Sequence, residues 1–291
     1  MNYGLTLTGG GARGAYHAGV YRALTELKVP VTAVSGTSIG AVTAALIAAG
    51  ENRSIRRLWK SLSLELITGR KKLSFNCSTD NVKALLDMII NEDKIRASDM
   101  LFGFEVMCPH RLRNRELFID DIPKGELTDY LTAAVCLPVF KPYIIRGIIY
   151  IDGGFLDNAP FDMLIKRGHK NIILSDDHGI GMERRLRDRE VNLIRIRYKR
   201  PKGSILNFSA DVTGRAIMQG YFDTLRELGA VSGEVYAFEN EDYFRWVKKY
   251  GRESIRRLEK AAKKAGIDPL RRYRIGELAG LIRNSEFGIR N

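Results

Sequence analysis

The chain has 291 residues, of which 45% are hydrophobic and 28% are charged, a composition that excludes a disordered or fibrous protein. The net charge of +13 lies mainly in the last third: residues 184–291 hold 25 basic and 14 acidic side chains, against 22 and 20 before them. A basic region of this kind fits an anionic membrane, an acidic lipid or simply a solvated surface. No nucleic-acid-binding motif accompanies it, so we expect no nucleic-acid partner.

Three cysteines, Cys77, Cys108 and Cys136, are too few for a disulfide framework, and none belongs to a CxxC pair. With only four histidines beside them, we expect no metal site and no cofactor. The first residues show no signal peptide, which favours a reducing, cytoplasmic location. Residues 29–50 are uncharged, but Pro30 and a polar, glycine-containing turn predict a strand, a turn and a helix rather than a membrane span.

Short β-like runs alternate with helical patterns over residues 1–200, which predicts a three-layer α/β domain with a mainly parallel central sheet. The strands are expected at 3–8, 31–35, 102–108, 116–119, 144–151, 171–174 and 193–198. The helices are expected at 15–28, 39–49, 51–95, 127–135 and 161–167. Residues 201–291 form a second, mainly helical region that we expect to pack on the first, with helices at 209–229, 240–265 and 275–284 and a short strand near 235–238.

A glycine-rich loop directly follows the first expected strand and opens the first helix. It consists of Gly9, Gly10, Gly11, Ala12, Arg13 and Gly14. Backbone N–H groups converge in such a loop, and the helix N-terminus adds positive potential, so it can hold a phosphate or an oxyanion. A dinucleotide site would need an acid after the second strand and a P-loop would need a lysine. Both are missing, which favours an oxyanion hole over nucleotide binding or a purely structural turn.

A G-x-S-x-G pentapeptide, 36–40, lies between the second expected strand and the next helix, which is the setting of a nucleophile elbow. Gly36 and Gly40 permit the close strand-to-helix turn that exposes the Ser38 hydroxyl. The helix N-terminus would stabilise negative charge developing there. The structural alternative is that Ser38 is an ordinary helix N-cap.

A serine nucleophile needs a base, and the histidines supply one poorly. His17 lies in the first helix, where a surface or packing role is expected. His178, after Asp176 and Asp177, is the remaining histidine candidate. Asp152 offers another solution, because it ends an apolar strand and is followed by Gly153 and Gly154, whose lack of side chains leaves it accessible from a cleft. Its structural alternative is a turn aspartate.

Together these motifs resemble the patatin-like phospholipase family over residues 4–165. The family pattern is a G-G-G-x-[RK]-G loop, a G-T-S-x-G elbow and a D-G-[GA] turn, and all three occur here in that order. The family's A-S-x-x-x-P-x-x-F block is recognisable at 133–140, with Ala134 in place of the usual serine. Asn158 and Pro160 also fit the stretch that follows the D-G-G turn.

The resemblance implies a Ser-Asp dyad in which Ser38 attacks an ester carbonyl and Asp152 is the base, without a histidine or a metal. The glycine loop would stabilise the oxyanion, chiefly through the N–H groups of Gly10, Gly11 and Ala12. The implied activity is a serine lipid acyl hydrolase acting on phospholipids or lysophospholipids. Two alternatives stay open: a soluble esterase or thioesterase with the same dyad, and a non-catalytic module that binds anionic lipid.

One C-terminal segment suggests how such an enzyme would reach a membrane. Residues 245–264 contain nine basic and two acidic side chains, with Trp246 and Tyr250 among them. As a helix, this segment would lie on an anionic bilayer with its aromatic rings at the interface. The alternative is a solvated helix face.

Overall fold

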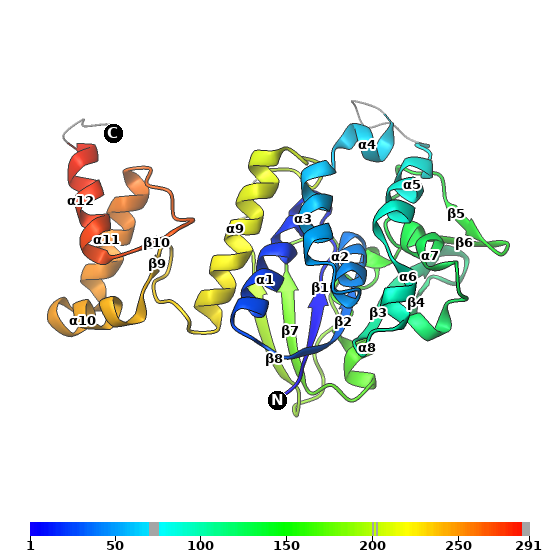
Figure 1. The fold of residues 1–291 in the computed structure, drawn as a ribbon, viewed down its shortest axis with the longest axis horizontal. Helices are drawn as coiled ribbons and strands as arrows, with labels where there is room; N and C mark the ends of the chain where they lie inside the picture. Colours follow the sequence, from blue (N-terminus) through cyan, green and yellow to red (C-terminus); the bar gives the residue numbers. More distant parts are fainter. Residues whose placement is uncertain (70–75, 200, 202, 287–291) are drawn as a thin grey trace. The chain divides into compact units, whose positions relative to one another are not determined.

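The computed structural model describes residues 1–69, 76–199, 201 and 203–286. The chain divides into two compact units, Met1–Gly220 and Tyr221–Asn291. The division falls inside the long helix α9 (Ala210–Glu227), later along the chain than the sequence boundary at 200. Packing of the C-terminal region on the first unit stays a prediction (Figure 1).

The first unit is built on an eight-stranded sheet. Seven strands follow one another in the order β5-β6-β3-β2-β1-β7-β8, and the eighth, β4, pairs with β3. Strands β3, β2, β1, β7 and β8 are parallel, whereas β4, β5 and β6 pair antiparallel. The strands are β1 (Tyr3–Leu7), β2 (Val31–Gly36), β3 (Leu101–Cys108), β4 (Arg113–Phe118), β5 (Tyr143–Ile145), β6 (Ile148–Asp152), β7 (Asn171–Asp176) and β8 (Asn192–Arg197).

Helices cover both faces of this sheet, which gives the expected three layers (Figure 1). Adjacent strand residues point to opposite faces, and the end of β2 shows which helix lies on each. The Ser35 hydroxyl donates to the Pro160 carbonyl at the start of α8, 3.1 Å away. A Cβ on the next residue, Gly36, would meet the backbone of Gly40 in α2 at 2.4 Å. The helices of the first unit up to α9 are α1 (Ala15–Glu26), α2 (Ile39–Ala48), α3 (Asn52–Ser61), α4 (Leu64–Thr68), α5 (Asp80–Ile89), α6 (Glu92–Arg96), α7 (Leu127–Ala134) and α8 (Phe161–Lys166).

The sequence expectations are confirmed for most elements, including 29–50, which forms β2 and α2. The single strand expected at 144–151 is wrong: β5 and β6 form a hairpin there. Arg146 and Gly147 turn the chain, with φ of 50° and 77°, as a two-residue hairpin turn of the primed type requires. The helical stretch expected at 51–95 is divided into α3 to α6, with 70–75 outside the described residues. Within the described residues, none of the helices has both the length and the apolar character needed to cross a bilayer.

The second unit packs three helices around a small apolar core: α10 (Asn240–Tyr250), α11 (Arg252–Lys264) and α12 (Ile275–Glu286). A short parallel pair, β9 (Ala237–Phe238) and β10 (Arg272–Tyr273), completes it. The helix expected at 240–265 is interrupted at Gly251, whose φ of 79° is left-handed. The basic segment 245–264 is therefore two helices, and Trp246 packs against the core of this unit.

Candidate active site

Ser38 stands at the junction of β2 and α2 in the backbone conformation that a nucleophile elbow requires. Its φ of 55° and ψ of −131° fall where only glycine is unstrained. The close packing that enforces this turn comes from Gly36 and Gly40, since a Cβ on Gly40 would lie 2.5 Å from the Leu7 carbonyl oxygen. The Ser38 hydroxyl forms no capping bond to α2. Its side chain is therefore not committed to the ordinary N-cap role.

Strand β3 brings Asp152 to Ser38. The first half of β3 pairs with β2, with Phe104 opposite Gly36, and its second half pairs with β6, with Val106 opposite Asp152. The ends of β2 and β6 thus meet two residues apart along one edge of β3, a distance of roughly 7 Å. Two motifs that are more than a hundred residues apart in the sequence become neighbours because they share one strand.

The Asp152 carboxyl group is buried beside the Ser38 hydroxyl. Burial raises the pKa of Asp152 to about 6, and the nearby Ser38 hydroxyl and Gly154 N–H act in the opposite direction. Asp152 Oδ1 accepts from the Gly154 N–H at 2.8 Å. Asp152 Oδ2 makes no hydrogen bond within 3.5 Å to the described residues. One carboxylate oxygen is therefore held by the D-G-G turn, and the other is available for a proton.

The glycine-rich loop lies directly against the serine. A Cβ on Gly9 would come within 2.8 Å of Ser38 Cβ. Gly9 is fixed by Asn158, whose side chain accepts from the Gly9 N–H at 2.9 Å and donates to the Gly9 carbonyl at 3.0 Å. Asn158 follows the D-G-G turn, so it ties the glycine loop to the segment that carries Asp152.

Only part of the loop is free to donate to a substrate. The Ala12 N–H donates to the Ile205 carbonyl at 2.7 Å, and the Arg13 N–H donates to the Gly10 carbonyl at 3.2 Å. The N–H groups of Gly10 and Gly11 find no acceptor in the described part of the chain. Of the three donors expected from the sequence, Gly10 and Gly11 can serve an oxyanion in this conformation, and Ala12 cannot.

His17 and Asp177 lie beneath this loop and form a buried network that the sequence did not predict. The His17 ring bonds the Thr8 carbonyl through Nε2 at 2.8 Å and the Ser175 hydroxyl through Nδ1 at 2.7 Å. Because a carbonyl only accepts, Nε2 carries the proton and Nδ1 accepts. Burial lowers the pKa of His17 to about 4, so the ring is neutral near pH 7. His17 is thus a buried packing residue below the loop, which is one of the two roles expected from the sequence.

Asp177 lies on the other side of this network, next to His17 and Thr8. Its Oδ1 accepts from the Thr8 hydroxyl at 2.8 Å, and its Oδ2 is 3.6 Å from His17 Nε2. Burial raises the pKa of Asp177 to about 7. The following residue, His178, is exposed, and no hydrogen bond in the described part of the chain joins its ring to Ser38 or Asp152.

The fold and the site together match one family. A model of the patatin-like phospholipase family matches residues 5–165, more than half of the chain. The chain belongs to the patatin-like phospholipase family. The departure at Ala134 lies at the end of α7, where the side chain is fully buried.

Several members of the family resemble this chain in sequence or in fold. Lysophospholipase NTE1 of Candida albicans is 30% identical over 184 residues, which are 60% of this chain and 13% of that protein. Patatin-like phospholipase domain-containing protein 6 of Homo sapiens is 30% identical over 182 residues, 59% of this chain and 13% of that protein. The chain therefore matches only a small part of these relatives. The crystal structure of VipD from Legionella pneumophila shares the fold, with a TM-score of 0.59 and 14% identity over 99% of this chain and 79% of that one.

A second charged cluster of this patatin-like protein contacts the D-G-G turn and the residues next to it. Arg184 Nε lies 2.9 Å from Asp157 Oδ2 and its guanidinium lies 3.8 Å from buried Glu105. Asn114 donates to the Gly153 carbonyl at 2.9 Å. Burial, followed by the charge of Asp157, raises the pKa of Glu105 to about 8. These contacts fix the turn without touching the Asp152 carboxylate.

Two segments far along the chain lie over the site. Arg13 donates to the His178 carbonyl at 2.8 Å and to the Gly203 carbonyl at 3.4 Å, which ties both segments to the glycine loop. The Met182 carbonyl accepts from the Asn158 N–H at 2.6 Å. Phe155, Ile180 and Met182 are exposed around the D-G-G turn. Exposed apolar side chains therefore lie near the D-G-G turn that carries Asp152, and an acyl substrate favours such a surface.

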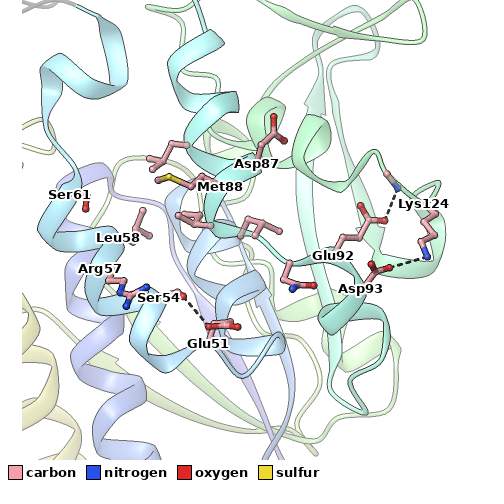
Figure 2. A pocket seen from close by; sticks show the side chains of 15 residues that line it. Glu51, Ser54, Arg57, Leu58, Ser61, Asp87, Met88, Glu92, Asp93 and Lys124 are labelled. Atoms are coloured by element: carbon pink, nitrogen blue, oxygen red, sulfur yellow. Dashed lines mark hydrogen bonds and ion pairs between the residues drawn. The ribbon is translucent and has the colours of Figure 1, made fainter.

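A hollow of about 800 Å³ lies between α3 and the segment that carries α5 and α6 (Figure 2). Leu58 and Met88 contribute apolar surface to it, and Glu51, Glu92 and Lys124 lie at its charged edge. Neither Ser38 nor Asp152 lines this hollow. The chemistry of the site is therefore not located there.

Proposed function

We propose that the protein is a serine lipid acyl hydrolase that cleaves fatty-acyl esters of phospholipids or lysophospholipids through an acyl-enzyme. The observation that carries the proposal is the arrangement at Ser38. A strained serine lies beside a buried carboxylate with a free oxygen and beside a glycine loop with two free N–H groups. The membership of the patatin-like phospholipase family points to the same class of reaction.

In the first half-reaction, Ser38 Oγ attacks the ester carbonyl carbon and its proton passes to Asp152 Oδ2. The tetrahedral oxyanion accepts from the N–H groups of Gly10 and Gly11, and the N-terminus of α2 adds favourable potential. Collapse breaks the carbon–oxygen bond of the ester, and Asp152 returns the proton to the departing alcohol. The acyl group is then bound to Ser38.

In the second half-reaction, water attacks the acyl-enzyme and gives its proton to Asp152. The new oxyanion occupies the same hole, and Ser38 leaves with the proton from Asp152. A carboxylate with its pKa raised to about 6 is a stronger base than an ordinary aspartate. The loop N–H groups must still supply much of the stabilisation, because one such donor contributes about 3–4 kcal/mol in other hydrolases.

We further propose that the enzyme acts in a reducing, cytoplasmic compartment and reaches its substrate at an anionic membrane surface. All three cysteines are buried, and none forms a disulfide within the described residues, which fits a compartment where disulfides are rare. The exposed apolar side chains around the D-G-G turn and the net charge of +13 favour contact with anionic lipid.

The test is hydrolysis of a lysophospholipid, a short p-nitrophenyl ester and an acyl thioester by wild type, Ser38→Ala and Asp152→Asn, with His178→Ala as control. We expect both site variants to lose at least a hundredfold in kcat on the lysophospholipid, while His178→Ala keeps its activity. Turnover of only the short ester or the thioester would favour a soluble esterase or thioesterase. A folded wild type that hydrolyses none of the three would favour a lipid-binding module without catalysis.

A further inference from the structure

A small basic pocket lies on the same sheet face as Asp152, at the edge formed by β4, β3 and β6. Its volume is about 230 Å³, and Arg111, Arg113 and Arg115 line it with His110 and Tyr150. A volume of this size holds several water molecules, at about 30 Å³ each, and so has room for a compact anionic group.

The strand register explains why the arginines converge. Arg115 lies opposite Val106 and Arg113 lies opposite Cys108 in the pair of β4 with β3. Val106 also lies opposite Asp152 in the pair with β6. Because directly opposed residues share a face, both arginines lie on the face that carries Asp152.

The acidic residues of the same strands lie on the other face. Glu105 and Glu116 oppose each other in the β3–β4 pair, one residue out of step with the arginines. They meet Arg184 there, at 3.8 and 3.7 Å. In the described part of the chain, Arg111, Arg113 and Arg115 form no ion pair with a carboxylate. The pocket therefore holds concentrated positive charge that no carboxylate of the described residues neutralises.

The pocket is also anchored toward the catalytic centre. The Arg115 guanidinium donates to the Tyr150 hydroxyl at 3.0 Å, and Tyr150 is 1% exposed. Tyr150 precedes Asp152 by two residues in β6, which separates their Cα atoms by roughly 7 Å. In a glycerophospholipid, the phosphate lies only a few bonds from the ester carbonyl, so one molecule can approach both places.

An exposed apolar side chain lies among the arginines of the pocket. Leu112, at the turn between β3 and β4, is 79% exposed and stands between Arg111 and Arg113 in the sequence. An apolar tip between arginines suits the boundary between lipid tails and head groups.

We propose that the pocket formed by Arg111, Arg113, Arg115 and Tyr150 binds a phosphate group, and that it selects phosphate-bearing acyl esters for the proposed hydrolase. Guanidinium groups bind phosphate oxygens in pairs through two parallel N–H bonds, and lysine ammonium groups do not reproduce this geometry. The selectivity rests on the proposed function, whereas the binding of phosphate does not.

The kinetic arm compares two substrates with the same acyl chain, a lysophosphatidic acid and the corresponding monoacylglycerol, in mixed micelles of neutral detergent. The test variant is Arg111→Gln/Arg113→Gln/Arg115→Gln. The matched control, Arg252→Gln/Lys260→Gln/Lys263→Gln, removes the same charge from exposed positions of α11. We expect the pocket variant to raise KM at least tenfold for the phosphate-bearing substrate only, with kcat within twofold. An equal effect on both substrates, or an equal effect of both variants, contradicts the selectivity.

The binding arm measures sn-glycerol 3-phosphate and inorganic phosphate by calorimetry on the full chain carrying Ser38→Ala, with and without the pocket substitutions. We expect binding that the pocket substitutions weaken at least tenfold and the α11 substitutions do not change. Undiminished binding in the pocket variant, or none in the parent, overturns the proposal. Binding of both ligands without any kinetic effect assigns the pocket to free phosphate rather than to a head group. If the wild type hydrolyses none of the esters, the calorimetric measurement still decides the proposal, because binding needs no turnover.

Discussion

Gly10 and Asp177 are in direct contact: a Cβ on Gly10 would lie 2.1 Å from Asp177 Oδ2. The carboxylate is completely buried, and it is fixed through Oδ1 by the Thr8 hydroxyl and the Gly179 N–H. It cannot move away without breaking these bonds. Position 10 therefore has no room for a side chain, and the position of the free N–H group of Gly10 depends on Asp177.

Gly10→Ala should therefore displace the glycine loop and remove an oxyanion donor. We expect kcat on a p-nitrophenyl ester to fall by about 10²–10³, the loss typical of one such donor. The matched control is Gly214→Ala in α9, where a Cβ would meet nothing within 4 Å. That variant should keep its activity and gain up to about 1 kcal/mol of helix stability. Full activity of a folded Gly10→Ala enzyme would contradict the assignment of the loop.

Asp177→Asn tests the buried network through the pH dependence of folding. The pKa of Asp177 is raised by burial to about 7, above the value of about 4 for an unfolded aspartate. Between pH 4 and 7 the folded state therefore holds a proton that the unfolded state has lost, and this lowers the free energy of unfolding as the pH rises. The asparagine has no such proton. The Tm of the variant minus that of wild type should increase from pH 4 to 7 and stay constant above.

Differential scanning calorimetry at unit pH steps measures this difference, with Asp120→Asn as an exposed control. The Asn side chain keeps an oxygen that can accept from Thr8 and Gly179. A difference in Tm that does not change with pH would show that Asp177 is ionised in the folded protein throughout this range.

Asp152 should give the enzyme an acidic limb in its pH–rate profile. The base must be ionised to accept the Ser38 proton, and burial raises the pKa of Asp152 to about 6. We expect kcat/KM for a neutral ester to be constant above pH 7 and to fall tenfold per pH unit below about 6. His178→Ala should reproduce this profile. Loss of the limb in that variant, or equal rates at pH 5 and 8, would assign the base elsewhere.

The strained backbone of Ser38 predicts an unusual order of stability among its variants. Glycine adopts a φ of 55° without the clash that any Cβ causes. Ser38→Gly should therefore be more stable than Ser38→Ala by about 1 kcal/mol, although both lose the hydroxyl. At Ser54 in α3 the order should reverse, because glycine is the poorer helix former. Urea denaturation of the four variants measures both differences, and the same order at both sites would argue against strain at Ser38.

The three motifs and the class of fold could be predicted from the sequence because each depends on local chemistry. A Gly-x-Ser-x-Gly segment between an apolar strand and a helix is visible without coordinates, and so is Asp152 at the end of a strand. What brings Ser38 and Asp152 together, the shared edge of β3, depends on strand order. That order could be inferred only from the resemblance.

The sequence errors have definite physical causes. Residues 144–151 are a nearly continuous β-branched run, and only Arg146-Gly147 marks the hairpin turn that divides it. A single glycine inside a long helical pattern does not by itself predict a break, yet the left-handed φ of Gly251 ends α10. The hydrogen bonds of His17 do not follow from the sequence because its partners, Thr8 and Ser175, lie at the ends of two different strands. The bond from the Ala12 N–H to Ile205 does not follow either, because Ile205 lies in the connection between β8 and α9, far along the chain.

The account depends most directly on Ser38 being an activated nucleophile. The decisive measurement is the rate of covalent labelling by a fluorophosphonate, with the modified residue identified by peptide mass spectrometry. In wild type we expect one label, on Ser38, with labelling absent in Ser38→Ala, at least a hundredfold slower in Asp152→Asn and unchanged in His178→Ala. A label on another residue, or labelling of Ser38 that does not depend on Asp152, would contradict the Ser-Asp dyad.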